Sequence, residues 1–290
     1  MKKLLLITLL SAISIQMFSQ ETGLSPFPQN QYSPAYFGPN ANPVPDFTAA
    51  IIPEFTTLSV AASYSFGFGD RTINPPLTIE IPLLPKKVSL KLWLPLMEYY
   101  SVTPAVYDYR KMEGKLSGST SGGDIYVQTR MLLFSEKRTV PAVVLNSTLR
   151  SASGGEFEER RYFDTPGYYF DVEIAKSFPI NTEVVSDIRL AADLGFMCWE
   201  TSGSTQNDAT MYGAKIILSN KSLDFENTIS GYSGWMKNGD QPLVFTSKLN
   251  GKLKNFRLFL QYKYGITDWN YHQLQAGVSF DLKKLTPKYN

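Results

Sequence analysis

Apolar and polar side chains alternate along residues 271–282, near the end of the chain. One side is apolar apart from a single histidine and carries His272, Leu274, Ala276, Val278, Phe280 and Leu282. The other side is mostly polar and carries Tyr271, Gln273, Gln275, Gly277, Ser279 and Asp281. A period of two residues predicts a β-strand with one apolar and one polar face. The alternation alone leaves open whether the apolar face meets a protein core or lipid.

The same pattern recurs along most of the chain and predicts about twelve strands. Helical periodicity is almost absent after residue 55. The sequence therefore predicts an all-β domain, with strands at residues 57–67, 77–83, 87–101, 122–134, 140–152, 168–177, 184–199, 210–219, 222–232, 242–251, 255–266 and 270–282.

Short and long connections alternate between these strands. The short ones are "LPKK", "SEKRT", "FPINTE", "NK" and "GKLKN", and the long ones include "GDRTINPP", residues 102–121 and "SGGEFEERRYFDTPG". Up-and-down strands with short turns at one end and long loops at the other are typical of transmembrane barrels. A Greek-key sandwich has no reason to keep this alternation.

Aromatic residues gather at two heights along the predicted strands. The long-loop ends carry Tyr168, Trp199, Tyr212, Tyr232, Tyr264 and Tyr271. The short-turn ends carry Phe134, Phe178, Phe225, Phe256 and Phe280. Two aromatic belts separated by an aliphatic band match the two interfaces of a bilayer. We therefore predict a transmembrane antiparallel barrel whose apolar face meets lipid.

The N-terminus predicts export. Lys2 and Lys3 precede the apolar run "LLLITLLSAISI", and Ser19 is a small residue at a plausible cleavage point. This is the pattern of a secretory signal peptide. The predicted organisation is a signal peptide at 1–19, a Pro/Asn-rich arm at 20–55, the barrel at 56–282 and a periplasmic tail at 283–290. The arm has no periodicity of its own, and we expect it to act as a plug, gate or tether, with both chain ends in the periplasm.

The stretch "QAGVSFDL", residues 275–282, resembles the C-terminal assembly signal of bacterial outer-membrane β-barrels. The matching positions are Gln275, Gly277, Phe280 and Leu282. The tail "KKLTPKYN" departs from the pattern, since many members stop at the last aromatic residue. The resemblance implies integral insertion among outer-membrane lipids by the barrel-assembly machinery. It indicates no functional subfamily.

The polar faces of the strands predict a charged interior. The candidate lumen-lining residues are Lys91, Arg130, Arg150, Asp171, Glu173, Asp187, Arg189, Asp193, Lys215, Asp224, Glu226, Lys248, Arg257 and Lys263. These charges could pair and fill the barrel, or they could line a narrow channel for small polar solutes with weak ion selectivity. We favour the channel; the alternatives are a filled structural or surface barrel and a soluble all-β binding module.

Other chemistry has little support in the sequence. The chain has 1 His and 1 Cys, so a His-rich metal site is excluded, and we expect no cofactor. A net charge of +2 gives no reason to expect a nucleic-acid partner. Barrel phospholipases carry a Ser two residues after their His, whereas Leu274 follows His272 here, so we predict no enzyme. The carboxylates of the loop 154–164 are offset by Arg160 and Arg161, and we expect that loop to be solvated.

Overall fold

The computed structural model describes residues 33–180, 182–201, 205–254 and 256–287. The predicted signal peptide, residues 1–19, lies outside this part of the chain. Among the described residues, no helix is long and apolar enough to cross a membrane.

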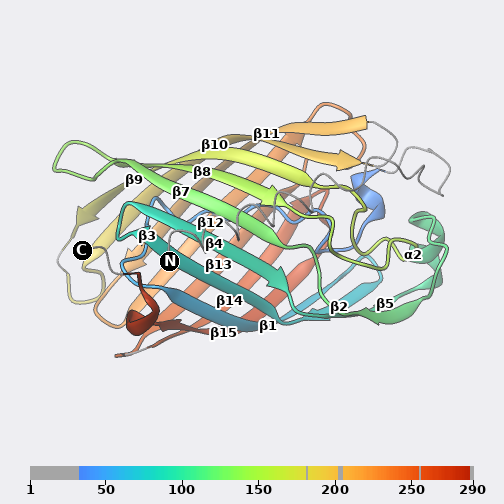
Figure 1. The fold of residues 1–290 in the computed structure, drawn as a ribbon, viewed down its shortest axis with the longest axis horizontal. Helices are drawn as coiled ribbons and strands as arrows, with labels where there is room; N and C mark the ends of the chain where they lie inside the picture. The colour runs from blue at the N-terminus through green and yellow to red at the C-terminus, as the bar shows by residue number, and fades with distance from the viewer. Residues whose placement is uncertain (1–32, 181, 202–204, 255, 288–290) are drawn as a thin grey trace, which may run out of the picture.

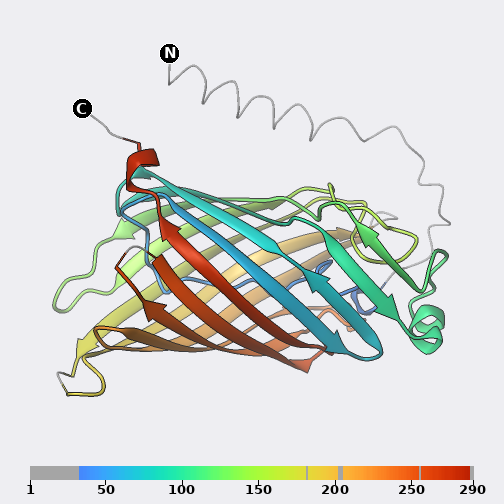
Figure 2. The same cartoon turned by 90° about the horizontal axis from the view of Figure 1, so that it is seen from below.

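Twelve antiparallel strands close into a barrel, because the last strand pairs with the first along their whole length (Figure 1, Figure 2). This confirms the predicted up-and-down barrel. The strands of the ring are β1 (Thr57–Gly67), β3 (Pro76–Leu84), β4 (Val88–Pro95), β7 (Tyr126–Phe134), β8 (Ala142–Arg150), β9 (Gly167–Pro179), β10 (Asp187–Thr201), β11 (Thr205–Ser219), β12 (Leu223–Gly234), β13 (Leu243–Lys252), β14 (Phe256–Thr267) and β15 (His272–Asp281).

Additional short elements extend the sheet at the long-loop end. The far half of β1 pairs with β2, β2 pairs with β5, and β5 pairs with β6. The stretches 69–76 and 102–121, predicted as loops, are therefore partly strand. Pro75 and Pro76, at the β2–β3 junction, supply no N–H to the ladder, so β2 and β3 are separate strands. These elements are β2 (Asp70–Asn74), β5 (Glu98–Val102), α2 (Pro104–Tyr109) and β6 (Ser117–Thr120), and the 3-10 turns elsewhere are η1 (Pro34–Tyr36) and η2 (Lys283–Leu285).

The barrel wall is apolar outside and polar inside. Leu194 and Leu260 point outward and are 64% and 57% exposed. Polar side chains on the opposite parity, such as Gln128, Asn146 and Thr148, are buried in the interior. A water-soluble barrel has the reverse arrangement, so the exposed apolar band is explained by a lipid surround.

Residues 33–56, which we call the lumen strap, run through the inside of the barrel. Ser33 donates a hydrogen bond to the carbonyl of Asn238, in the β12–β13 loop at the long-loop end. Gly38 N–H then donates to the carbonyl of Arg160 at 2.9 Å, in the β8–β9 loop. The described part of the arm therefore begins at the long-loop end, and the expected position of the N-terminus lies outside the described residues.

The strap leaves the barrel at the short-turn end. The carbonyl of Pro53 accepts a hydrogen bond from Lys86 N–H, in the β3–β4 turn, at 3.2 Å. Thr57 then opens β1 opposite Asp281, the last residue of β15. The strap thus spans the whole lumen before the first strand begins (Figure 2).

Candidate functional site: a plugged lumen

Glu173, on β9, holds the middle of the lumen strap. Its Oε1 accepts the Thr48 N–H at 3.1 Å, and its Oε2 accepts the Thr48 hydroxyl at 3.1 Å and the Ala50 N–H. The Asn146 side-chain amide donates to Oε1 at 3.0 Å. Glu173 is 1% exposed, so an ionised carboxylate needs these donors to remain buried.

Arg130, on β7, connects the strap with strand β3. Its Nη1 donates to the Ile51 carbonyl at 2.9 Å and to Glu80 Oε1 at 2.8 Å. Its Nη2 lies 3.7 Å from Glu173 Oε2. One guanidinium therefore joins β3, β7, β9 and the strap into a single charged network.

Further contacts with the strap also come from side chains. Lys215 Nζ lies 3.3 Å from Asp46 Oδ1 and donates to the Phe47 carbonyl. Arg189 Nε donates to the Ala49 carbonyl at 2.9 Å. Within the described chain, residues 42–52 make no backbone–backbone hydrogen bond to a strand. The strap is therefore a ligand-like segment inside the barrel, distinct from its wall.

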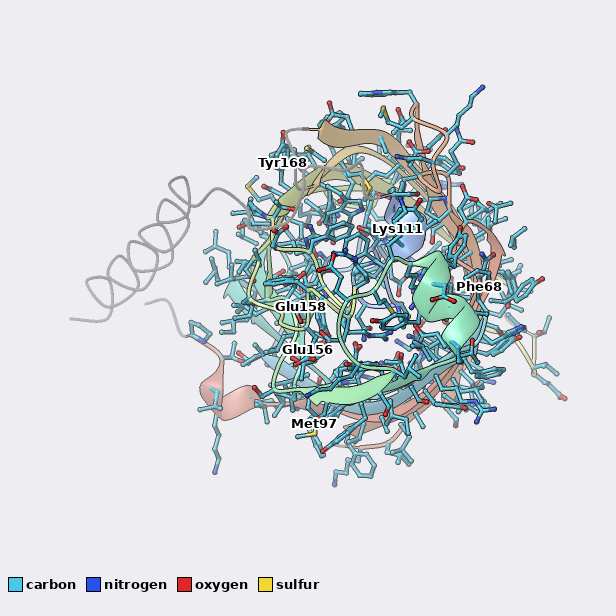
Figure 3. The ribbon with its side chains drawn as sticks, turned by 90° about the vertical axis from the view of Figure 1, so that its right-hand side faces the viewer. Phe68, Met97, Lys111, Glu156, Glu158 and Tyr168 are labelled. Atoms are coloured by element: carbon cyan, nitrogen blue, oxygen red, sulfur yellow. The ribbon has the colours of Figure 1, made fainter. Side chains whose placement is uncertain are left out.

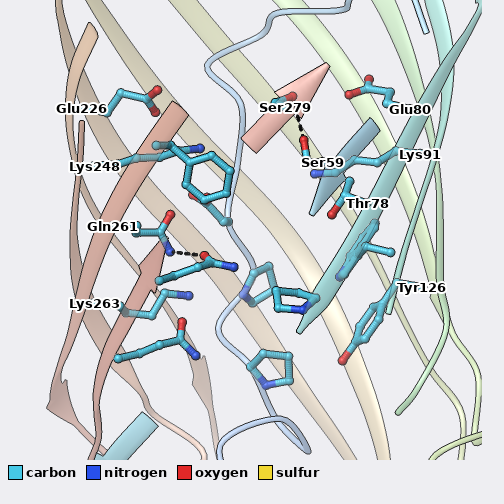
Figure 4. Close-up of a pocket in the computed structure, with 18 of the residues that line it drawn as sticks. Ser59, Thr78, Glu80, Lys91, Tyr126, Glu226, Lys248, Gln261, Lys263 and Ser279 are labelled. Atoms are coloured by element: carbon cyan, nitrogen blue, oxygen red, sulfur yellow. Dashed lines mark hydrogen bonds between the residues drawn. The ribbon is translucent and has the colours of Figure 1, made fainter. Parts of the chain in front are cut away.

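A cavity of about 500 Å³, which we call the lumen cavity, lies beside the strap (Figure 4). Its walls come from β1, β3, β4 and β12–β15, with strap residues 43–46 on one side. Charged, amide and hydroxyl side chains dominate the lining. This part of the interior is therefore a polar, unfilled space.

A second cavity of about 420 Å³ lies at the long-loop mouth, and no residue lines both cavities. The two are separated by aromatic side chains that pack with Val44 in one cluster. Tyr126, Tyr169 and Trp199 line the lumen cavity, whereas Tyr232, Trp269 and Tyr271 line the mouth cavity. This aromatic layer therefore lies between the two cavities.

The aromatic layer corrects part of the predicted outer belt. Tyr212 and Tyr264 are 39% and 42% exposed on the outer surface. Trp199, Tyr232 and Tyr271, however, are 1%, 1% and 5% exposed inside the barrel. The belt was predicted from the height of each residue along its strand. Whether a side chain points inward or outward depends instead on the alternation along the strand, and these three residues fall on the inward positions.

The long-loop mouth is covered by the β8–β9 loop, residues 151–166, and by the α2 region (Figure 3). Arg161 reaches Asp70 Oδ2 at 2.7 Å and Glu98 Oε1 at 2.6 Å. Arg110, at the end of α2, binds the same Asp70 oxygen at 2.5 Å. All four charged side chains are at most 1% exposed, so this loop is docked in the mouth through a buried ion network.

The carboxylates of this loop are less solvated than the sequence predicts. Glu159 and Arg160 are 6% and 3% exposed. Burial raises the pKa of Glu156, and the nearby Glu159 carboxylate raises it further. Burial also raises the pKa of Asp164. Among the described residues, no group of three or more His, Cys, Asp or Glu side chains could hold a metal ion.

The predicted lumen-lining charges fall into separate groups. Around the lumen cavity are Lys91, Asp224, Glu226, Lys248, Arg257 and Lys263. Buried in or beside the strap and mouth networks are Arg130, Arg150, Asp171, Glu173, Asp193 and Lys215, with Arg189 partly buried at the strap. Asp187 lies apart, partly exposed at the start of β10.

Sequence reasoning missed two parts of this site. Asp46 lies in a stretch without periodicity, so nothing in the local pattern indicates that it faces Lys215. The buried pairs of Asp70 and Glu98 with Arg161 join residues from separate loops. The charged run around Arg161 was visible, but only the fold shows that it enters the barrel.

The residues that resemble an assembly signal lie on β15 and just after it. Gln275 lines the lumen cavity, and Phe280 is 38% exposed on the outside. A Cβ added at Gly277 would lie 2.5 Å from the Phe259 ring, so this ring packs where a side chain would otherwise stand. Leu282 N–H donates to the Thr56 carbonyl at 2.7 Å. Recognition through these residues stays a prediction.

His272 belongs to the outer surface. Its Nδ1 lies 2.7 Å from the Tyr262 hydroxyl, and its ring stacks with that of Phe66. Leu274, two residues later, is 46% exposed on the same face. This cluster has the apolar and aromatic character of a lipid-facing surface.

These features define the fold of bacterial outer-membrane β-barrels. The NanC porin structure matches with a TM-score of 0.50 and 12% identity over 78% of this chain and 100% of that one. An outer membrane channel from Pseudomonas putida F1 matches with a TM-score of 0.53 and 12% identity over 81% and 98%. No family model and no curated protein sequence matches the chain. The similarity therefore concerns the fold.

Proposed function

We propose that the chain is an integral outer-membrane channel for small polar solutes, in which the lumen strap is a displaceable plug. Export would use the signal peptide at 1–19, and insertion among outer-membrane lipids would use the barrel-assembly machinery and residues 275–282. The long loops then face the exterior, as in other barrels of this kind.

The observation that carries this proposal is the polar lumen cavity beside a strap that side chains hold in place. A barrel whose only role is structural has no need of an unfilled polar interior. A strap without a backbone ladder to the wall can be displaced without breaking the sheet. The solved channels with this fold agree with the proposal at the level of architecture.

A filled structural barrel is the second candidate. The aromatic layer and the buried ion network around Arg161 both close the path toward the long-loop end. A barrel closed by these features in all conditions would conduct nothing and would serve as a surface scaffold.

Recordings in planar bilayers distinguish the two candidates. We expect the full mature chain to show small or intermittent currents, and deletion of residues 21–55 to increase them. Heat-modifiable migration in detergent gels verifies that each protein is folded. Silence from both folded proteins would contradict the channel and favour the structural barrel.

A further inference from the structure

Three lysines face the lumen cavity from two walls. Lys91 lies on β4, while Lys248 and Lys263 lie on β13 and β14. Figure 4 shows their ammonium groups pointing into the cavity from opposite sides. The barrel therefore brings together three positive charges from strands that are far apart in the sequence.

The carboxylates of the cavity lining are already paired with other cations. These pairs are Glu80 with Arg130, Asp224 with Lys252, and both Asp46 and Glu226 with Lys215. Among the described residues, no ion pair involves Lys91, Lys248 or Lys263. Glu80 and Glu226, the cross-strand neighbours of Lys91 and Lys248, make their ion pairs with Arg130 and Lys215 instead.

Aromatic rings support the aliphatic and ammonium parts of these lysines. Lys91 Nζ lies 4.9 Å from the centroid of the Trp93 ring, and Lys248 Nζ lies 4.7 Å from that of Phe259. The face of an aromatic ring attracts an ammonium group but offers no lone pair to its N–H donors. The remaining N–H donors are free to bind an anion in the cavity.

The strap supplies an internal example of such an anion. Asp46 projects from the strap with its side chain 50% exposed to the cavity. Lys91, Lys248 and Lys263 line the same cavity as this carboxylate. A solute carboxylate in the cavity would face the same three lysines.

Neutral polar groups complete the lining. Gln261 Nε2 donates to Gln275 Oε1 at 3.2 Å, and the Ser59 hydroxyl donates to the Ser279 hydroxyl at 2.8 Å. Such amides and hydroxyls can exchange these bonds for bonds to a hydroxylated solute. The volume of about 500 Å³ is in the range of small-molecule sites.

We propose that the lumen cavity is a binding site for a small hydroxylated organic anion, whose carboxylate is held by Lys91, Lys248 and Lys263. This inference deepens the proposed function, because it names the class of solute that the channel would take. The cavity is enclosed by the barrel wall and the strap, where ammonium groups without an ion pair attract an anion more strongly than in bulk water. Neutral polyols of the same size lack this attraction.

Titration calorimetry on the full mature chain in detergent tests the site without requiring conduction. Gluconate is the probe, and sorbitol is its neutral counterpart with the same carbon chain. We expect saturable binding of gluconate that weakens at high salt, and no binding of sorbitol. Combined substitution of Lys91→Gln, Lys248→Gln and Lys263→Gln should weaken gluconate binding about tenfold or more.

Two further variants make the result specific. The control Lys137→Gln/Lys221→Gln/Lys284→Gln removes the same net charge from exposed positions outside the cavity and should leave affinity unchanged. Asp46→Asn removes the internal competitor and should strengthen gluconate binding several-fold.

Clear outcomes would overturn the inference. They are the absence of saturable gluconate binding by the folded wild-type chain, equal losses in both triple variants, or equal binding of sorbitol. Conduction without gluconate binding would contradict this inference alone. Gluconate binding without conduction would contradict only the channel.

Discussion

Replacing Glu173 with glutamine should release the lumen strap while keeping the size of the side chain. Glu173 accepts hydrogen bonds from the Thr48 N–H, the Thr48 hydroxyl and the Ala50 N–H. Glutamine has no charge, and its side-chain NH₂ group cannot accept a hydrogen bond. At least one N–H or O–H group of Thr48 or Ala50 then faces the NH₂ group of glutamine, which is itself a donor.

The expected magnitude follows from these bonds. A hydrogen bond to a charged group contributes about 1.5–3 kcal/mol, and a neutral one about 0.5–1.5 kcal/mol. If two strap bonds each lose about 1–1.5 kcal/mol, the closed state is destabilised by about 2–3 kcal/mol. Since 1.4 kcal/mol is a factor of ten, the ratio of open to closed states should rise roughly 30- to 140-fold.

Single-channel recording of the full mature chain measures this ratio as an open probability. Asp224→Asn is the matched control, because Asp224 is a lumen carboxylate whose partners in the described structure, Lys252 and Ser219, lie on strands. We expect Glu173→Gln to open the channel and Asp224→Asn to leave it close to wild type.

Two results would refute this reasoning. An unchanged open probability in folded Glu173→Gln protein, alongside larger currents after strap deletion, would show that Glu173 does not anchor the plug. An equal rise in both variants would show that the loss of any lumen carboxylate is sufficient.

Two other predictions concern the wall and the strap. Leu260→Arg should destabilise the barrel by about 2–4 kcal/mol and reduce the heat-modifiable form in outer-membrane fractions. Gln261→Arg should have a mild effect, and equal effects would contradict the assignment of Leu260 to the lipid face and Gln261 to the lumen. With long loops outside, Ser33→Cys should be labelled by an impermeant maleimide on intact cells, whereas Glu54→Cys should not; the reverse pattern would place the strap in the opposite direction. Wild-type Cys198 is buried, so its background should be low.

Much of the barrel wall could be predicted from the sequence, because the pleat of a strand and the apolar bilayer together require apolar and polar residues to alternate. This alternation predicted that Leu260 points outward and Gln261 inward, since a shift by one residue would place every apolar side chain of the strand on the wrong face. The number of strands was predicted from the same alternation. The belt assignment of Trp199 was wrong because height along a strand and side of the sheet are independent properties.

The contents of the lumen depended on the tertiary structure. The strap has no periodicity, and its path is set by contacts with Glu173 and Arg130, which lie far along the chain and on different strands. The count of positive and negative residues likewise could not show that Lys263 has no ion-pair partner among the described residues, because pairing depends on distances across the barrel. Local sequence determined which side of the wall each residue occupies, whereas only closure of the barrel decided which of the enclosed charges meet, because those contacts join residues from separate strands and loops.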